Sequence, residues 1–288
     1  MSNGMRWPHA TLLATAMLCA QVQSWTYSEH GKDWPAQFPY CSGRAFPERL
    51  FNNYQAPVNV EDDGSFGPVD EPPEMLSRGA CTAPGRITNG HSWEVTYSNS
   101  SCKTAFTTRF GGLVYNLDQY HLHSGGENLI NGHRSAMELH LVHDDPTEHG
   151  TYDLVLAIRL EVAPNDSMPD IHAISLQTLP TDPYMGFIQL LAARRSTYFT
   201  FLGSMTTPDC RSDVRWILFN ETLTISPEML HAFIADVGPS RTDGVRTQMT
   251  DDCPELPHNP YCSYREVQPL NSREVRTGRL LVPSAEHQ

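Results

Sequence analysis

The chain has 288 residues, of which 39% are hydrophobic and 18% are charged, as in a globular protein with a substantial core. Its 33 acidic and 20 basic residues give a formal net charge of −13 at pH 7, which repels nucleic-acid phosphates and anionic lipid. This charge balance disfavours nucleic acid and anionic membranes as partners and favours solubility, but it does not indicate a fold.

Residues 1–24 have the pattern of a cleaved secretory signal peptide. Arg6 and His9 precede an apolar run at 10–20, which is followed by small and polar residues. The run is shorter than the ~20 apolar residues that span a bilayer. We therefore expect secretion, to the cell exterior, the periplasm or the lumen of the secretory route, and a catalytic domain at 25–288. A frayed N-terminal helix is the alternative. The C-terminus carries no hydrophobic anchor tail.

The mature chain begins with residues 25–54, rich in Pro, Gly and aromatic residues, which predict irregular structure laid across a core. Residues 61–85 predict an acidic loop. From residue 86 the pattern changes to short β-like runs separated by turn residues. The predicted strands are Trp93–Tyr97, Lys103–Phe110, Leu113–His123, Ala136–His143, Leu154–Val162 and Val214–Phe219.

Long amphipathic helices are scarce, and the better helix candidates are Pro183–Ala193 and Ser226–Ile234. In the second, Ser226 is the expected N-cap and Pro227 occupies the first helical position. Together these elements predict one mainly β (α+β) domain with short peripheral helices.

Cysteine usage agrees with secretion. Loss of Cys19 with the signal peptide would leave an even number of cysteines, which predicts disulfides and leaves their pairing open. Asn-x-Ser/Thr sequons at Asn99, Asn165 and Asn220 are compatible with a secreted glycoprotein. No close Cys-x-x-Cys pair is present, so a cysteine-based zinc site is not expected.

Two β-like segments carry the residues suited to metal chemistry. Residues i and i+2 of a strand share a face, so His121 and His123 project together, as do Glu138, His140 and Val142. If the two strands pair, three imidazoles converge, and three nitrogen ligands with one open position are typical of catalytic zinc. Neutral imidazoles leave the metal its full charge, which lowers the pKa of bound water to about 7.

The same residues support a rival interpretation. His121-x-His123 followed by Glu127 is also the opening motif of cupins, β-barrels that bind Mn, Fe or Zn with the glutamate as a ligand. A cupin needs a second motif marked by Gly and Pro that supplies another histidine. Residues 150–172 contain no such run, so the cupin interpretation is disfavoured.

The chain as a whole resembles the α-class carbonic anhydrases, in ordered blocks from about Trp25 to Val275. The matching blocks are Gln55–Val60 (QSPINI in the family), Asn89–His91 (NGH), Gln119–His123 (QxHxH), Glu127 with Glu138–His143 (ELHLVH), Gly203–Pro208 (GSLTTP) and Tyr264–Asn271 (YRxxQPLN). The resemblance implies a single domain built on a large twisted, mostly antiparallel central sheet.

This resemblance implies that His121, His123 and His140 bind Zn²⁺. The implied reaction is reversible hydration of carbon dioxide to bicarbonate and a proton, by attack of zinc-bound hydroxide. His91 matches the family's proton shuttle, and a histidine titrating near neutral pH suits that task.

Other matching positions imply supporting roles. Gln119 and Glu138 match the hydrogen-bond partners that orient the first and third zinc ligands, and the carbonyl of Ser263 matches the partner of the second. Thr206 matches the residue that orients the hydroxide, and Glu127 matches the carboxylate that accepts the Thr206 proton. Carbon dioxide has no net charge or dipole, so its implied pocket is apolar. The implied substrate-binding residues are Val142, Val155, Met205, Thr207, Val214 and Trp216.

Cys41 and Cys210 match a disulfide found in extracellular members of the family. It would hold the Thr206 loop close to the N-terminal segment. For the remaining cysteines, short separations favour a Cys81–Cys102 pair and a Cys253–Cys262 pair.

Some positions depart from the family pattern. Phe201 replaces a usual Tyr whose hydroxyl joins the active-site water network. Glu94 occupies a cleft position that is often Asn or Gln, where a carboxylate would raise the pKa of His91. Ser124–Gly126 replaces bulkier residues, and Asn128 stands where His is common. None of these changes removes a zinc ligand, so activity is expected.

The alternative within the family is a non-catalytic binding or storage protein, although such relatives typically lose a zinc histidine and this chain keeps all three. The insertions at 44–54 and 61–85 have no assigned counterpart. The sequence leaves open whether they support a homodimer.

Overall fold

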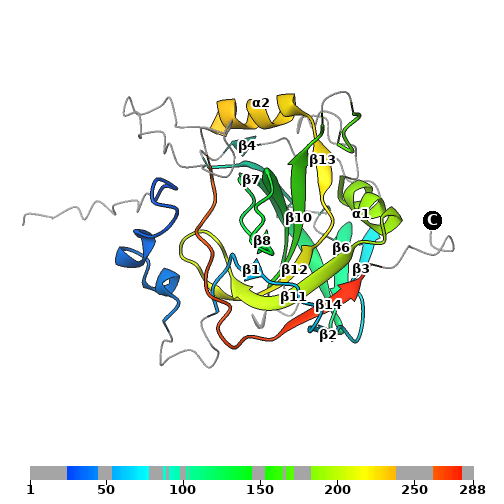
Figure 1. The fold of residues 1–288 in the computed structure, drawn as a ribbon, viewed down its shortest axis with the longest axis horizontal. Helices are drawn as coiled ribbons and strands as arrows, with labels where there is room; N and C mark the ends of the chain where they lie inside the picture. Colours follow the sequence, from blue (N-terminus) through cyan, green and yellow to red (C-terminus); the bar gives the residue numbers. More distant parts are fainter. Residues whose placement is uncertain are drawn as a thin grey trace, which may run out of the picture.

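The computed structural model describes residues 25–44, 54–77, 87–88, 91–97, 102, 104–144, 153–164, 167–171, 183–237 and 262–280 (Figure 1). The predicted signal peptide, Cys81, Cys253 and the sequons at Asn99 and Asn165 lie outside the described residues.

A large curled sheet forms the centre of the molecule (Figure 1). Its strands are β2 (Gly67–Pro68), β3 (Glu74–Ser77), β4 (Ile87–Thr88), β5 (Trp93–Thr96), β6 (Phe106–Phe110), β7 (Leu113–Ser124), β9 (Met137–Asp144), β10 (Asp153–Val162), β11 (Thr197–Ser204), β12 (Ser212–Phe219), β13 (Leu223–Ile225) and β14 (Val275–Arg279). The strand order is β2-β14-β11-β12-β10-β9-β7-β5-β4; β13 also pairs with β10, and β6 joins β7 to β3. Parallel pairing is limited to β10 with β12 and β13, and β14 with β2. The prediction of a mainly β fold with a mostly antiparallel central sheet is confirmed.

Short elements complete the described fold. β1 (Asn59–Val60) and β8 (Leu129–Ile130) form a separate parallel pair. The helices are η1 (Trp34–Ala36) and η2 (Pro39–Ser42), both 3₁₀, and α1 (Pro183–Ala193) and α2 (Pro227–Val237). Within the described part of the chain, no helix has the length and apolar character needed to cross a membrane.

The start of α2 is as predicted. The backbone N–H of Met229 donates to Oγ of Ser226 at 3.2 Å, which satisfies one of the unpaired donors at the helix N-terminus. The helix ends at Val237 rather than at Ile234, because its apolar stripe continues to the buried Val237.

Alternate side chains of β10 enter two different hydrophobic cores. Leu154, Leu156 and Ile158 belong to the larger core, which also contains the buried faces of α1 and α2. Val155 and Ala157 belong to a smaller core on the opposite face of the strand. The two helices therefore cover one face of the sheet, and the candidate site develops on the other.

One prediction from the sequence was wrong in part. The segment at 61–85 was expected to be a loop, but it contains β2 and β3. Strand β3 pairs with β6 at the sheet edge, and Glu74 forms an ion pair with Arg109 at 2.7 Å. Edge strands such as β3 are largely exposed and lack a clear apolar alternation, so their pairing depends on distant residues.

Candidate metal centre

The three predicted metal-binding histidines converge. Strand β7 supplies His121 and His123, strand β9 supplies His140, and His121 is the register partner of His140. One ring nitrogen from each histidine lies within 4.8 Å of the others. His123 and His140 are buried, whereas His121 keeps partial exposure.

The outward-facing nitrogen of each ring has a hydrogen-bond acceptor. The pairs are His121 Nδ1 with Oε1 of Gln119 at 2.8 Å, His123 Nδ1 with the carbonyl of Ser263 at 2.6 Å, and His140 Nε2 with Oε1 of Glu138 at 2.7 Å. An acceptor at this position places the proton on the outer nitrogen and fixes the ring orientation. The inner nitrogens therefore present lone pairs toward one another.

This donor set fits a zinc ion. Burial lowers the pKa of His123 to about 4 and that of His140 well below its ordinary value, so the rings are neutral at pH 7. Nε2 of His121 and Nε2 of His123 are only 3.0 Å apart, and two lone pairs at this distance repel unless a cation lies between them. Three imidazole nitrogens with an open side are typical of catalytic zinc.

Glu127 lies directly beside the histidines. Its Oε1 accepts a hydrogen bond from the backbone N–H of Arg265 at 2.8 Å, and its Oε2 lies 3.4 Å from Nε2 of His123 and 4.0 Å from Nδ1 of His140. Burial raises the pKa of Glu127 to about 8, while the Thr206 side chain and the Arg265 N–H favour the charged form. A cation at the histidines would lower this pKa, because nearby opposite charge stabilises a carboxylate.

An apolar wall adjoins the centre. The predicted wall residues Val142, Val155, Val214 and Trp216 are buried in the smaller core, and Met205 packs against it. The ring centroid of Trp216 lies 5.0 Å from that of His140, in an edge-to-face arrangement. Thr207 follows Thr206 in the adjoining turn, where its carbonyl accepts a hydrogen bond from the N–H of Cys210 at 2.7 Å.

His91 is held by aromatic side chains. Its ring stacks on Trp25 with centroids 4.1 Å apart, and Tyr27 contacts both His91 and His123 edge-on. Burial lowers the pKa of His91, so the expected rise caused by Glu94 was wrong. The Glu94 carboxylate instead accepts a hydrogen bond from the Thr96 hydroxyl at 2.8 Å.

Phe201 lies in the smaller core beside the proposed substrate-binding wall. Phe201 is 1% exposed and stacks on Trp216 within the smaller core, with ring centroids 6.3 Å apart. The ring of Phe201 therefore contributes to core packing behind the wall.

Gly125 and Gly126, which follow His123 and Ser124, let the backbone pack closely against neighbouring side chains. This contact was not predicted from the sequence. A Cβ on Gly125, whose φ is +69°, would lie 2.7 Å from Cδ1 of Tyr264. A Cβ on Gly126 would lie 2.2 Å from Oγ of Ser135 and 3.3 Å from Oε2 of Glu138. The turn can therefore pack against both neighbours only without side chains.

We expect Gly126→Ala to lower the free energy of unfolding by about 1–3 kcal/mol, because Ser135 must rotate and lose its hydrogen bond to the Met137 carbonyl. Urea denaturation measures this loss. Gly186→Ala in α1 is the matched control, because its Cβ would meet nothing within 4 Å. Equal stability of the two variants would contradict the steric argument.

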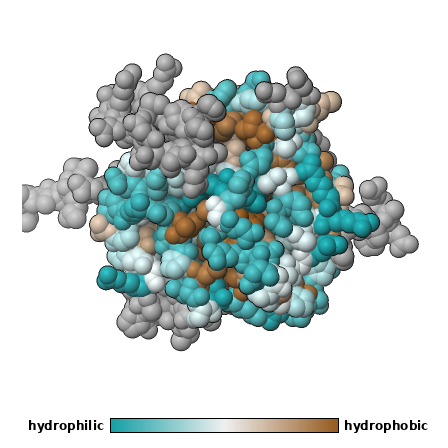
Figure 2. Space-filling model, viewed as in Figure 1, coloured by the Kyte–Doolittle hydropathy of each residue, from teal (hydrophilic) through white to brown (hydrophobic). Residues whose placement is uncertain are grey.

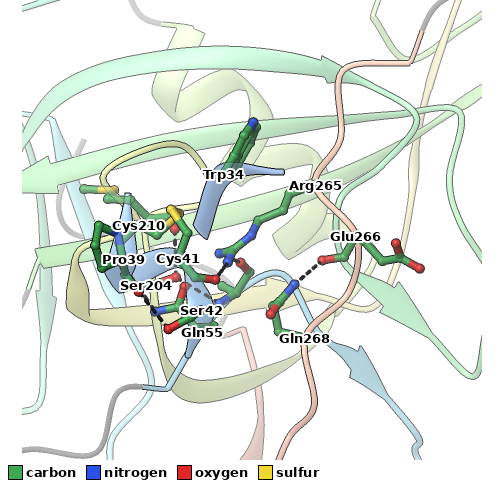
Figure 3. Close-up of a disulfide and its surroundings, with 12 residues drawn as sticks. Trp34, Pro39, Cys41, Ser42, Gln55, Ser204, Cys210, Arg265, Glu266 and Gln268 are labelled. Atoms are coloured by element: carbon green, nitrogen blue, oxygen red, sulfur yellow. Dashed lines mark hydrogen bonds between the residues drawn. A yellow bond between two sulfur atoms is a disulfide. The ribbon is translucent and has the colours of Figure 1, made fainter. Parts of the chain in front are cut away.

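A disulfide joins the N-terminal segment to the loop that carries Thr206 (Figure 3). Cys41 in η2 is bonded to Cys210, and the two Cα atoms are 5.0 Å apart. The buried guanidinium of Arg265 donates to the carbonyl of Cys41 at 2.7 Å, and Nε2 of Gln55 donates to the carbonyl of Cys210 at 3.2 Å. The predicted Cys41–Cys210 bridge is confirmed, and it sits among polar contacts that hold both chain segments.

Cys102 and Cys262 also form disulfides. Their pairing with Cys81 and Cys253 remains a prediction, because both proposed partners lie outside the described residues.

Replacing both Cys41 and Cys210 by Ser should lower the free energy of unfolding by about 2–5 kcal/mol, since the bridge closes a long loop in the unfolded chain. Equilibrium unfolding in urea under non-reducing conditions checks this value. An unchanged unfolding midpoint would show that the bridge does not stabilise the native state.

Comparison with known proteins agrees with this geometry. The chain is 25% identical to carbonic anhydrase 1 of Mus musculus over 278 residues, covering 88% of this chain and 97% of the relative. It is 26% identical to carbonic anhydrase 6 of Homo sapiens over 306 residues, covering 92% of this chain and 88% of the relative.

Solved structures share the fold. The α-carbonic anhydrase of Thermovibrio ammonificans in complex with sulfanilamide superposes with a TM-score of 0.60 at 23% identity, covering 88% of this chain and 98% of that one. The α-carbonic anhydrase of Photobacterium profundum superposes with a TM-score of 0.55 at 22% identity, covering 88% of this chain and 100% of that one. The sequence model of the eukaryotic-type carbonic anhydrases matches residues 29–279, and the chain therefore belongs to this family.

Proposed function

We propose that this chain is a zinc enzyme that catalyses the reversible hydration of carbon dioxide to bicarbonate and a proton. The observation that carries the proposal is the convergence of three neutral imidazoles, each oriented by an acceptor on its outer nitrogen. Zinc held by His121, His123 and His140 would act as a Lewis acid and lower the pKa of a bound water to about 7.

Thr206 and Glu127 would orient the nucleophilic oxygen. With Glu127 ionised, the Thr206 hydroxyl donates its proton to that carboxylate, so its oxygen is left as the acceptor for the nucleophile. The nucleophile then has one lone pair directed toward the substrate carbon, which is a positioning effect. The hydrogen bond from the Arg265 N–H to Oε1 of Glu127 keeps the carboxylate in place.

The apolar wall would receive carbon dioxide. Val142, Val155, Val214 and Trp216 form a surface without charge beside His140, to which Met205 adds a flexible side chain. An uncharged substrate without a dipole gains from this surface, whereas the bicarbonate product does not. Thr207 lies next to Thr206 and completes the proposed substrate-binding set.

His91 would carry the proton between the cleft and the solvent. Its pKa is lowered by burial against the aromatic rings, so the neutral, proton-accepting form persists below pH 6.5. The acid limb of the turnover rate should therefore lie below the ordinary histidine pKa.

His91→Ala should slow turnover in weakly buffered solution by about 10–100-fold, and added imidazole should restore the rate because it accepts the proton instead. Stopped-flow measurements of hydration at several buffer concentrations provide the comparison. His231→Ala, at an exposed position on α2, is the matched control. A His91→Ala rate that does not depend on buffer would remove His91 from the proton path.

Secretion is part of the proposal. Disulfides persist in oxidising compartments, and the bridge between Cys41 and Cys210 fits such a location. The signal peptide at 1–24, the domain at 25–288 and glycosylation remain predictions. The sequon asparagine that the structure describes is Asn220, and its Nδ2, the atom to which a glycan would be attached, donates a hydrogen bond to Oγ1 of Thr197 at 3.2 Å.

Inhibition by a primary sulfonamide tests the proposed function. Sulfanilamide is named as the inhibitor bound to the Thermovibrio ammonificans enzyme, and here it should suppress hydration with one molecule bound per zinc. Hydration that is insensitive to sulfanilamide, or zinc-loaded protein with no hydration activity, would refute the proposal. The second result would favour a non-catalytic binding protein.

A further inference from the structure

The carboxylate behind His140 is fully enclosed by the chain. Glu138 is 0% exposed, and its Oε1 accepts two hydrogen bonds, from Nε2 of His140 at 2.7 Å and from Nδ2 of Asn128 at 2.7 Å. Its Oε2 accepts a hydrogen bond from the backbone N–H of Asn128 at 2.9 Å. A single residue, Asn128, thus contacts both oxygens of the group that orients His140.

The side chain of Asn128 is itself held in one orientation. It is completely buried, and its Oδ1 accepts a hydrogen bond from the backbone N–H of Val58 at 3.0 Å. Because Oδ1 of Asn128 accepts the hydrogen bond from Val58, the amide NH₂ must face Glu138. The adjoining residues lie in the β1–β8 pair, in which Asn59 is in register with Leu129. Asn128 is therefore held by its hydrogen bond to Val58 and by its place directly before β8.

Other neighbours of Glu138 do not take this role. Arg159 is its register partner on β10, but the guanidinium donates to the carbonyl oxygens of His133 and Asn220. Gly126 approaches closely and contributes no side chain. Among the residues that the structure describes, the hydrogen-bond donors to Glu138 from outside its own strand are thus those of Asn128.

We infer that Asn128 is a positioning residue of the metal centre, which fixes Glu138 and through it turns Nδ1 of His140 toward the other two histidines. Without the amide donor, the carboxylate can rotate about its side-chain bonds. His140 Nε2–H then loses a fixed acceptor, and the ring can leave the direction that the metal requires. Partners behind a metal ligand typically change metal affinity by about 10–100-fold when they are removed. The inference rests on the proposed zinc centre.

Asn128→Asp provides the sharpest test, because it keeps the oxygen that accepts from Val58 and exchanges the NH₂ donor for a second oxygen. Asn128→Ala is a second variant that removes the donor without adding charge and keeps the backbone N–H to Glu138. Asn59→Ala is the matched control, since the side-chain oxygen of Asn59 also accepts a backbone hydrogen bond, from the N–H of Gly132 at 2.9 Å in an exposed turn, and does not contact Glu138.

Two readouts separate a positioning role from a general loss of stability. Competition with a chelator should show zinc affinity reduced about 10–100-fold in Asn128→Asp and Asn128→Ala and unchanged in Asn59→Ala. The cobalt-loaded protein should show an altered visible absorption spectrum in the Asn128 variants only, because that spectrum reports ligand geometry.

Each outcome has a definite meaning. Unchanged zinc affinity and cobalt spectrum in either folded Asn128 variant would overturn the inference, as would an equal loss of affinity in Asn59→Ala. If the unchanged chain binds no zinc, the proposed function and this inference fall together. If it binds zinc and hydrates no carbon dioxide, the proposed function is refuted. The role of Asn128 is then decided by the zinc affinities of its variants alone.

Discussion

His140→Ala should lose the proposed zinc ion, and its carbon dioxide hydration should fall to the uncatalysed rate, which is the largest effect that we expect of any single substitution. His140 is the sole ligand candidate contributed by β9, and its ring is fixed by Glu138 on one side and packed edge-on against Trp216 on the other. Two remaining imidazoles on β7 offer too few ligands for a structural or catalytic zinc site. Metal analysis after dialysis and stopped-flow hydration measure the two losses together.

His231→Ala serves as the control for general effects of removing a histidine, because His231 is exposed on α2, which packs on the other face of the sheet. Its zinc content and hydration rate should match those of the unchanged chain. A His140→Ala protein that retains full zinc and activity would mean that the three-histidine centre is not the metal site.

Thr206→Val should reduce kcat/KM about 100-fold while zinc remains bound, because the variant keeps the size of the side chain and loses the hydroxyl that orients the nucleophile. The partner in this arrangement is Glu127, whose Oε2 lies 3.4 Å from Nε2 of His123. The effect should appear in the hydration kinetics and not in the zinc content.

Thr206→Ser is the matched control, since it keeps the hydroxyl and removes only a methyl group. It should retain most of the activity. Equal rates for the Val and Ser variants would show that the hydroxyl of Thr206 does not act in the reaction, and would leave Glu127 without its proposed role.

The metal-binding histidines could be predicted from the sequence, because strand periodicity alone places His121 and His123 on one face of a strand. Pairing β7 with β9 then requires one register, and that register sets His121 opposite His140. Glu127 is close to His123 in the sequence, but its role, and the distant Thr206, came only from the family resemblance. The large open sheet and the family match also remove the cupin alternative.

Features that depend on three-dimensional contacts were missed or misjudged. The exposed β3 carries no strong strand pattern, and its pairing with β6 is a long-range contact. The pKa of His91 was expected to rise because Glu94 matches a cleft position of the family, but the ring is stacked on Trp25 and its burial lowers the pKa. The sequence around Gly126 did not indicate that a side chain at this position would collide with Ser135.

The apolar smaller core also explains why Phe201 is tolerated. Its ring stacks on Trp216, whose Nε1–H donates to the carbonyl of Ser204 at 3.1 Å, so the indole has a partner that does not involve position 201. From the sequence alone Phe201 was a lost hydroxyl, whereas in the fold it is part of the wall behind the proposed substrate pocket. Figure 2 shows patches of apolar residues within a largely hydrophilic surface.

The most direct test of the central claim is the hydration rate of carbon dioxide measured by stopped flow as a function of zinc content. Protein stripped by a chelator should be inactive, and activity should rise in proportion to added zinc until one ion is bound per chain. Folded protein that binds one zinc ion per chain and gives no hydration above the buffer rate would contradict the account.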